Sequence, residues 1–130
     1  MRGLALIAIA MAALAAGCGT GSDKRKVRST VERFVSALDR REGRAACRRL
    51  SEEASSKLES EEKRPCPRAV LALGLSSSSV TKVEVFITSA RADLADGEAA
   101  FLDKTPGGWK ISAAGCKPRG DMPYDCELEA

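Results

Sequence analysis

The apolar residues of this chain change their spacing about halfway along the sequence, and no other feature limits the possible folds so strongly. In the first half they recur at steps of three and four residues, which places them on one face of a helix. The clearest such run lies within 24–41 and contains Val27, Val31, Phe34, Val35 and Leu38. In the second half the period becomes two, which is the pattern of a strand with one buried face. The sequence therefore predicts helices followed by a sheet.

Capping residues set the bounds of the first two helices. Asp23 has a side chain suited to the N-cap of the helix at 24–41, and Gly43 is expected to close that helix. A short second helix is expected at 44–50, with its small and apolar residues turned inward.

Two further helices are expected before the sheet begins. Ser51 is followed by two glutamates, which suits an N-cap hydroxyl with acidic residues in the first helical turn. Pro67 fits the first position of a last helix at 68–73, and Gly74 would close it. The first half is thus read as helical hairpins.

Turn signals divide the second half into antiparallel strands. The alternating run 82–88 is the first strand, with Val83, Val85 and Ile87 on its buried face. The Asp-Gly pair at 96–97 marks a hairpin turn between strands.

A second turn at 105–108 leads into a strand at 109–112. Residues 120–124 read as a loop, and the tail 125–130 either adds an edge strand or remains free. The predicted fold class is α+β, with N-terminal helices packed on an antiparallel sheet.

The N-terminus carries an apolar run that ends at a cysteine. Arg2 precedes thirteen uncharged residues, Leu4 to Ala16, which predicts a signal peptide at 1–17. The run is shorter than the roughly 20 apolar residues that cross a bilayer. The segment Leu14-Ala15-Ala16-Gly17-Cys18 resembles the lipobox of bacterial lipoproteins, in which the cysteine receives diacylglycerol, although the leucine stands one place early.

This resemblance implies that Cys18 is the lipid attachment site and that 18–23 form a lipidated tether. The rest of the chain, 24–130, has a length within the usual range of one domain, so a single domain is expected. The protein would then lie on the outer face of the cell membrane. An ordinary signal peptide, with Cys18 left as a free thiol, is the alternative.

Four cysteines remain when Cys18 is set aside, and export favours disulfides between them. Three pairings are possible. We favour Cys47 with Cys66 and Cys116 with Cys126, because both pairs join elements that are expected to be neighbours. A zinc site is disfavoured, since neither close pair has C-x-x-C spacing and the chain has no histidine. No cofactor or metal is expected.

Charge is distributed unevenly along the chain. Ten lysines and arginines lie within 24–49, against three acidic residues, whereas the last third is acidic. The basic segment would lie close to the anchor, where it either contacts anionic lipid or forms a solvated helix face. Nucleic acid is a poor partner, because export separates the chain from it and no aromatic residues interleave with the arginines.

Several segments together resemble the nuclear transport factor 2-like superfamily, in particular small exported lipoproteins of actinobacterial type. They are the amphipathic run 31–38, the turn 43–47, the Gly-Gly-Trp-Lys-Ile strand at 107–111, and the cysteine-containing segments 115–116 and 124–126. The resemblance implies a cone in which helices pack on the concave face of a curved sheet. It could enclose a small apolar pocket lined by Phe34, Phe101 and Trp109, although the same aromatics would also serve as core residues.

Catalysis has little support in the sequence. Enzymatic members of this superfamily, such as ketosteroid isomerase, use a pocket carboxylate as base, and only Glu84 could serve here. We therefore expect a tethered binding or scaffold module, not an enzyme, for a small apolar ligand or a protein partner. The alternatives are a ketosteroid-isomerase-like enzyme with Glu84 as base, and an interaction module that pairs, for example as a homodimer, through the open sheet face.

Overall fold

The order of elements along the chain agrees with the change in apolar spacing. The computed structural model describes residues 20–130, so the predicted signal peptide at 1–17 and Cys18 lie outside the described range. Within that range helices precede strands, which confirms the α+β prediction. The helices are α1 (Thr20–Asp39), α2 (Gly43–Cys47), α3 (Glu52–Glu62) and α4 (Cys66–Ala72). The strands are β1 (Val80–Val85), β2 (Ser89–Leu94), β3 (Ala99–Thr105), β4 (Gly108–Arg119) and β5 (Met122–Glu129).

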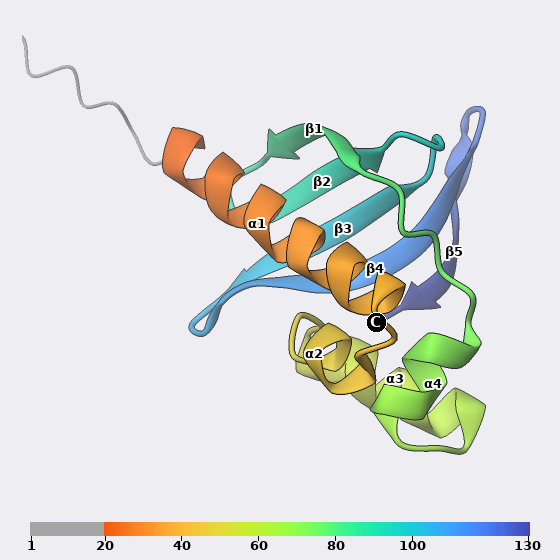
Figure 1. Cartoon of the computed structure of the whole chain (residues 1–130). Helices are drawn as coiled ribbons and strands as arrows, with labels where there is room; N and C mark the ends of the chain where they lie inside the picture. The colour runs from red at the N-terminus through yellow and green to blue at the C-terminus, as the bar shows by residue number, and fades with distance from the viewer. Residues whose placement is uncertain (1–19) are drawn as a thin grey trace, which may run out of the picture.

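The strands form one antiparallel sheet in the order β1-β2-β3-β4-β5, as expected for a meander. In Figure 1, α1 crosses one face of this twisted sheet, while α2, α3 and α4 gather beside the C-terminal end of α1. The other face of the sheet is left open by the helices. None of the helices within residues 20–130 is both long and apolar enough to cross a membrane.

The main core lies between α1 and the covered face of the sheet. Its fully buried members come from both layers, and the largest of them are Leu102, Ile111, Val27, Val31 and Val70. Because every helix and every strand contributes at least one residue to this cluster, the layers are stabilised by one continuous hydrophobic core.

The first helix differs from its prediction at both ends. It begins at Thr20, so the expected tether at 18–23 is helical from Thr20 onward and Asp23 lies inside the helix instead of capping it. The helix ends at Asp39, and Arg41, two residues later, adopts a left-handed conformation with φ 56°. The Glu42 N–H donates to the Ala37 carbonyl (2.8 Å) and the Arg41 N–H to the Leu38 carbonyl (3.1 Å). These two bonds form a Schellman motif, which here uses an arginine where glycine is usual.

Gly43 does not close α1 but begins α2, where it contacts the backbone of α4. A Cβ atom at this position would lie 2.1 Å from the Pro67 carbonyl oxygen. Only glycine allows α2 and α4 to approach so closely. This close approach, and not the predicted helix cap, explains why residue 43 is a glycine.

The predicted N-cap of α3 is confirmed. The buried Ser51 hydroxyl accepts a hydrogen bond from the Ala54 N–H at 3.1 Å. The segment 49–51 also pairs with β4, since the Ser51 N–H donates to the Ile111 carbonyl and the Ile111 N–H donates to the Arg49 carbonyl, both at 2.8 Å. This segment therefore covers the part of the β4 edge that β5 does not reach.

The first strand ends earlier than its alternation predicts. Val83 is buried, but β1 stops at Val85, and Ile87 is 93% exposed in the turn that leads to β2. The prediction that Ile87 faces the core was wrong, because the Phe86 N–H already closes the turn by donating to the Ser89 carbonyl at 2.8 Å.

The next hairpin turn follows its sequence signal. Gly97 has φ 90°, and the Asp96 carboxylate accepts from the Glu98 N–H at 3.0 Å. The Asp-Gly prediction is thus confirmed.

The last two strands are longer than expected. β4 extends to Arg119 and β5 begins at Met122, so the predicted loop at 120–124 shrinks to a turn at 120–121. The tail is an edge strand and is not free. Gly115 allows β4 to continue past a crowded point, since it has φ 65° and an added Cβ would lie 2.8 Å from Leu75.

Candidate functional site

The three aromatics of the predicted pocket do not come together. Phe34 and Trp109 are both buried in the main core, at 3% and 5% exposure. Phe101 lies on the opposite face of the sheet, where its ring meets that of Tyr124 edge-on at 5.1 Å. The strand alternation explains the separation, because Phe101 stands between the inward-facing Ala100 and Leu102.

Side chains fill the space beneath α1. A cavity of about 10 Å³ remains there, between Phe34 and Val31 on the helix and Ala100 and Ala114 on the sheet. A cavity needs roughly 10–15 Å³ to hold one water molecule. This space is too small for an organic ligand.

Glu84 does not have the surroundings of a pocket base. Its carboxylate lies 2.8 Å from the Lys82 ammonium and 3.0 Å from the Arg91 guanidinium. Arg91 also forms an ion pair with Asp93, at 3.0 Å and without a hydrogen bond, so a charged network covers this part of the open sheet face.

These partners lower the pKa of Glu84, with the Lys82 hydrogen bond as the largest cause and Lys24 a smaller one. A general base of the ketosteroid isomerase kind needs the opposite environment, an apolar site. The arrangement that the enzyme alternative requires of Glu84 is therefore absent.

A polar cluster that the sequence did not reveal fastens the start of α1 to the sheet. The two oxygens of Asp23 accept hydrogen bonds from Trp109 Nε1 and Lys104 Nζ, both at 3.1 Å. Lys104 also lies 5.8 Å from the centre of the Trp109 ring, within the range of a cation–π contact. We call these three residues the Asp23 cluster. Asp23 is more than 80 residues from Lys104 and Trp109 in sequence, so no local sequence pattern predicts this cluster.

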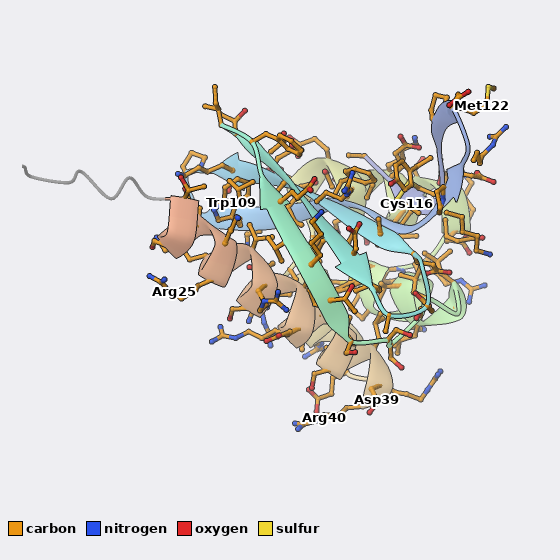
Figure 2. All side chains as sticks on the ribbon, turned by 90° about the horizontal axis from the view of Figure 1, so that it is seen from above. Arg25, Asp39, Arg40, Trp109, Cys116 and Met122 are labelled. Carbon is orange, nitrogen blue, oxygen red and sulfur yellow. A yellow bond between two sulfur atoms is a disulfide. The ribbon has the colours of Figure 1, made fainter. Side chains whose placement is uncertain are left out.

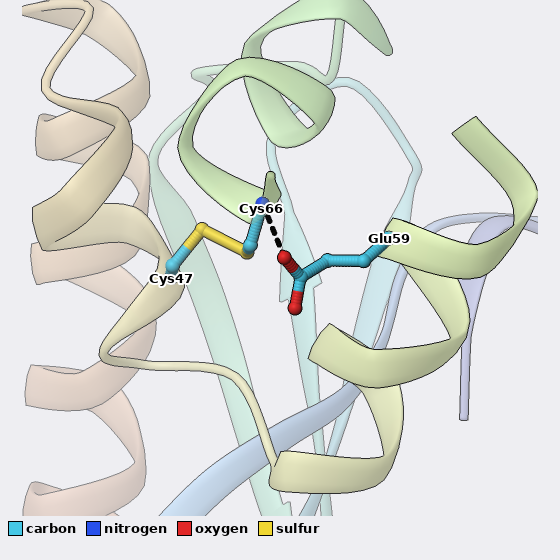
Figure 3. The surroundings of a disulfide bond; sticks show 3 residues. All are labelled: Cys47, Glu59 and Cys66. Carbon is cyan, nitrogen blue, oxygen red and sulfur yellow. Dashed lines mark hydrogen bonds between the residues drawn. A yellow bond between two sulfur atoms is a disulfide. The ribbon is translucent and has the colours of Figure 1, made fainter. Parts of the chain in front are cut away.

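Both predicted disulfides are present. Cys47 pairs with Cys66 and Cys116 with Cys126, the connectivity favoured from the sequence. The first joins α2 to the beginning of α4, and the second joins residues directly opposite each other on β4 and β5. In Figure 3 the Glu59 carboxylate of α3 accepts a hydrogen bond from the Cys66 N–H at 3.1 Å. The disulfide and this bond hold three short helices together.

The surface formed by residues 20–130 has several open grooves, and two of them border the β3–β4 turn. The larger, about 870 Å³, lies between α3 and the β3–β4 turn, and both glutamates and lysines line it. A second, about 430 Å³, lies between α1 and the same turn, and no carboxylate lines it. Its charged lining residues are Arg25, Lys26, Arg33, Arg49 and Lys110.

We call the second hollow the basic groove. In the range 20–130 none of its five cations forms an ion pair, although Lys110 Nζ donates to the Arg48 carbonyl at 2.8 Å. Its charge is thus available to an external anion. The basic character of 24–49 is visible in the sequence, but only folding adds Lys110 of β4 to the set.

The described part of the chain contains no cluster of side chains suited to bind a metal ion. Among residues 20–130 no three acidic or cysteine side chains are grouped in a way that could hold an ion. The predicted lipid attachment site, Cys18, lies outside this range.

Comparison with known proteins gives no relative for this chain: no family model, no curated protein and no solved structure matches it.

Proposed function

We propose that this protein is an exported lipoprotein, anchored through Cys18 on the outer face of the cell membrane, that serves as a binding or scaffold module. The main support for this proposal is that the five cysteines fall into two groups, four in disulfides and one at the end of the apolar run. Four of the five form two disulfides, and the fifth follows an apolar run of signal-peptide length. Disulfides persist in oxidising compartments, and a cysteine at the end of such a leader is suited to lipid attachment.

The start of α1 supports an anchor close to the domain. Thr20, the first described residue, is already helical and stands only two positions after Cys18. Two residues span at most about 7 Å when extended. An anchor on Cys18 would therefore hold the domain next to the lipid headgroups.

A binding or scaffold role is favoured over catalysis by the filled interior and by the ion pairs of Glu84. The cavity of about 10 Å³ beneath α1 leaves no room for a small apolar substrate. The grooves on the surface are open and polar, which suits a headgroup or a protein segment better than an apolar small molecule. Membership of the nuclear transport factor 2-like superfamily remains part of this proposal, supported by helices that cover one face of an antiparallel meander.

Intact-mass measurement of protein extracted from the membrane of its host tests the anchor. We expect residues 1–17 to be missing and a diacylglyceryl increment to be present. The matched control is the Cys18→Ser variant, which should lack the increment and leave the membrane fraction. An unmodified Cys18 thiol in the wild-type protein would overturn the proposal.

A further inference from the structure

Exposed apolar side chains gather at two turns of the sheet. Ile87 and Phe86, in the β1–β2 turn, are 93% and 55% exposed, and Met122, the first residue of β5 after the β4–β5 turn, is 60% exposed. Two adjacent large apolar residues at the tip of a hairpin are costly to leave in water unless something covers them.

Hydrogen bonds place the β1–β2 turn beside the start of α1. Thr88 of this turn accepts from the Lys104 N–H at 2.8 Å, and the Lys104 side chain reaches Asp23 in the first turns of α1 at 3.1 Å. Further along, Arg28 donates to the Val80 carbonyl at 3.1 Å, so α1 and β1 lie side by side in opposite directions. The exposed pair Phe86 and Ile87 therefore lies at the same end of the molecule as Thr20, the first described residue.

The same end of the molecule also carries cations that form no ion pair within residues 20–130. The basic groove opens between α1 and the β3–β4 turn, and Lys24, Arg25 and Lys26 are all exposed on the first turns of α1. Figure 2 shows Arg25 and Trp109 at this end and Met122 at the opposite one. The Asp23 carboxylate accepts hydrogen bonds from Lys104 and Trp109, and its ion pair is with Lys104 and not with these three cations.

From this juxtaposition we infer that the end formed by the start of α1, the β1–β2 turn and the basic groove docks onto an anionic lipid bilayer. Phe86 and Ile87 enter the boundary between headgroups and acyl chains, and the groove cations contact lipid phosphates. An apolar tip flanked by cations is the arrangement that binds such an interface. The inference rests on the membrane location proposed above, and it adds a second contact that does not involve Cys18.

The sequence before Thr20 also favours a lipid bilayer as the binding partner of this end of the molecule. Nineteen residues precede Thr20, and thirteen of them form the uncharged run Leu4 to Ala16. Whether the chain is held by this run or by a lipid on Cys18, the attachment point lies only a few positions before Thr20. Thr20 is at the same end of the molecule as Phe86, Ile87 and the cations. A soluble acidic protein would have to compete with that surface for the same end.

Hydroxyl-radical footprinting of the full chain in vesicles tests the inference. The chain, with residues 1–19 retained, is reconstituted in phosphatidylcholine alone or in phosphatidylcholine with phosphatidylglycerol. We expect oxidation of Phe86 and Ile87 to fall several-fold only in the anionic vesicles. Met122 is the internal control, and its oxidation should be equal in both.

Charge variants supply the matched comparison. The Arg25→Gln/Lys26→Gln protein loses two cations, each of which strengthens contact with an anionic surface about fivefold, so docking should weaken roughly 25-fold. The Lys117→Gln/Arg119→Gln protein loses two exposed cations near Met122 and should keep the protection.

Equal oxidation of Phe86 and Ile87 in the two kinds of vesicle would overturn the inference. So would protection that persists in the Arg25→Gln/Lys26→Gln protein, or protection of Met122 in place of the β1–β2 turn. The intact mass of protein extracted from the host membrane scores the lipid on Cys18 in a separate sample, so failure of the docking surface and failure of the lipid anchor are distinguishable.

Discussion

Removal of the Cys47–Cys66 disulfide should cost this protein a large part of its stability. The two cysteines are 19 residues apart, and closing a loop of that length restricts the unfolded chain by about 3 kcal/mol in the loop-entropy model. Cys66 is also almost fully buried, so truncation to alanine adds a smaller packing loss. The helices that it joins, α2 and α4, have five and seven residues and would not persist alone.

Urea unfolding of the oxidised wild-type and Cys47→Ala/Cys66→Ala proteins measures this cost. With a slope near 1.5 kcal/mol per molar urea, the midpoint should fall by about 2 M. The matched control is Cys116→Ala/Cys126→Ala, which opens a loop of separation 10 and should cost about 0.5 kcal/mol less in the same model.

Two results would refute the reasoning. One is a loss below about 1 kcal/mol for the Cys47–Cys66 pair, well under the loop-entropy value. The other is a clearly larger loss for the Cys116–Cys126 pair, which would show that loop length does not govern the effect.

Three further predictions concern the fold. Gly43→Ala should destabilise the protein by about 1–3 kcal/mol, because its Cβ would meet the Pro67 backbone; an unchanged melting temperature would contradict this close approach. Leu102→Ala should cost about 2–5 kcal/mol in urea unfolding, whereas Ile87→Ser, at an exposed turn, should stay within about 0.5 kcal/mol; similar losses would contradict the assignment of faces. The Trp109 hydrogen bond, with Lys104 second, lowers the pKa of Asp23 below 3.8. The folded state then binds fewer protons than the unfolded state, so this contribution is present above about pH 4 and is lost as pH falls through the lowered pKa. Melting curves between pH 2 and pH 6 should therefore show a weaker acid dependence for Asp23→Asn, and equal slopes would argue against the Asp23 cluster.

The features that were predicted correctly are those decided by neighbouring residues. The Ser51 cap and the Asp96-Gly97 turn each depend on a few positions in sequence. The disulfide connectivity followed from the expected order of helices and strands.

The predictions that were wrong depended on where distant segments meet. Asp23 could have capped a helix, but Trp109 and Lys104 from the β3–β4 hairpin hold its carboxylate instead. Ile87 continues the alternation of β1, yet the turn closes before it. Phe101 was assigned to a pocket by type, although its position between Ala100 and Leu102 already places it on the other face.

Through the contact between segment 49–51 and β4, the oxidation of Cys47 and Cys66 affects how readily the protein associates with itself. This segment follows directly after Cys47, so the disulfide helps to keep it on the β4 edge at Ile111. An uncovered strand edge presents free N–H and C=O groups that can template pairing with another molecule. Chains in which Cys47 and Cys66 are still reduced would therefore be the ones most prone to aggregate, and the rate of disulfide formation would set how long that risk lasts.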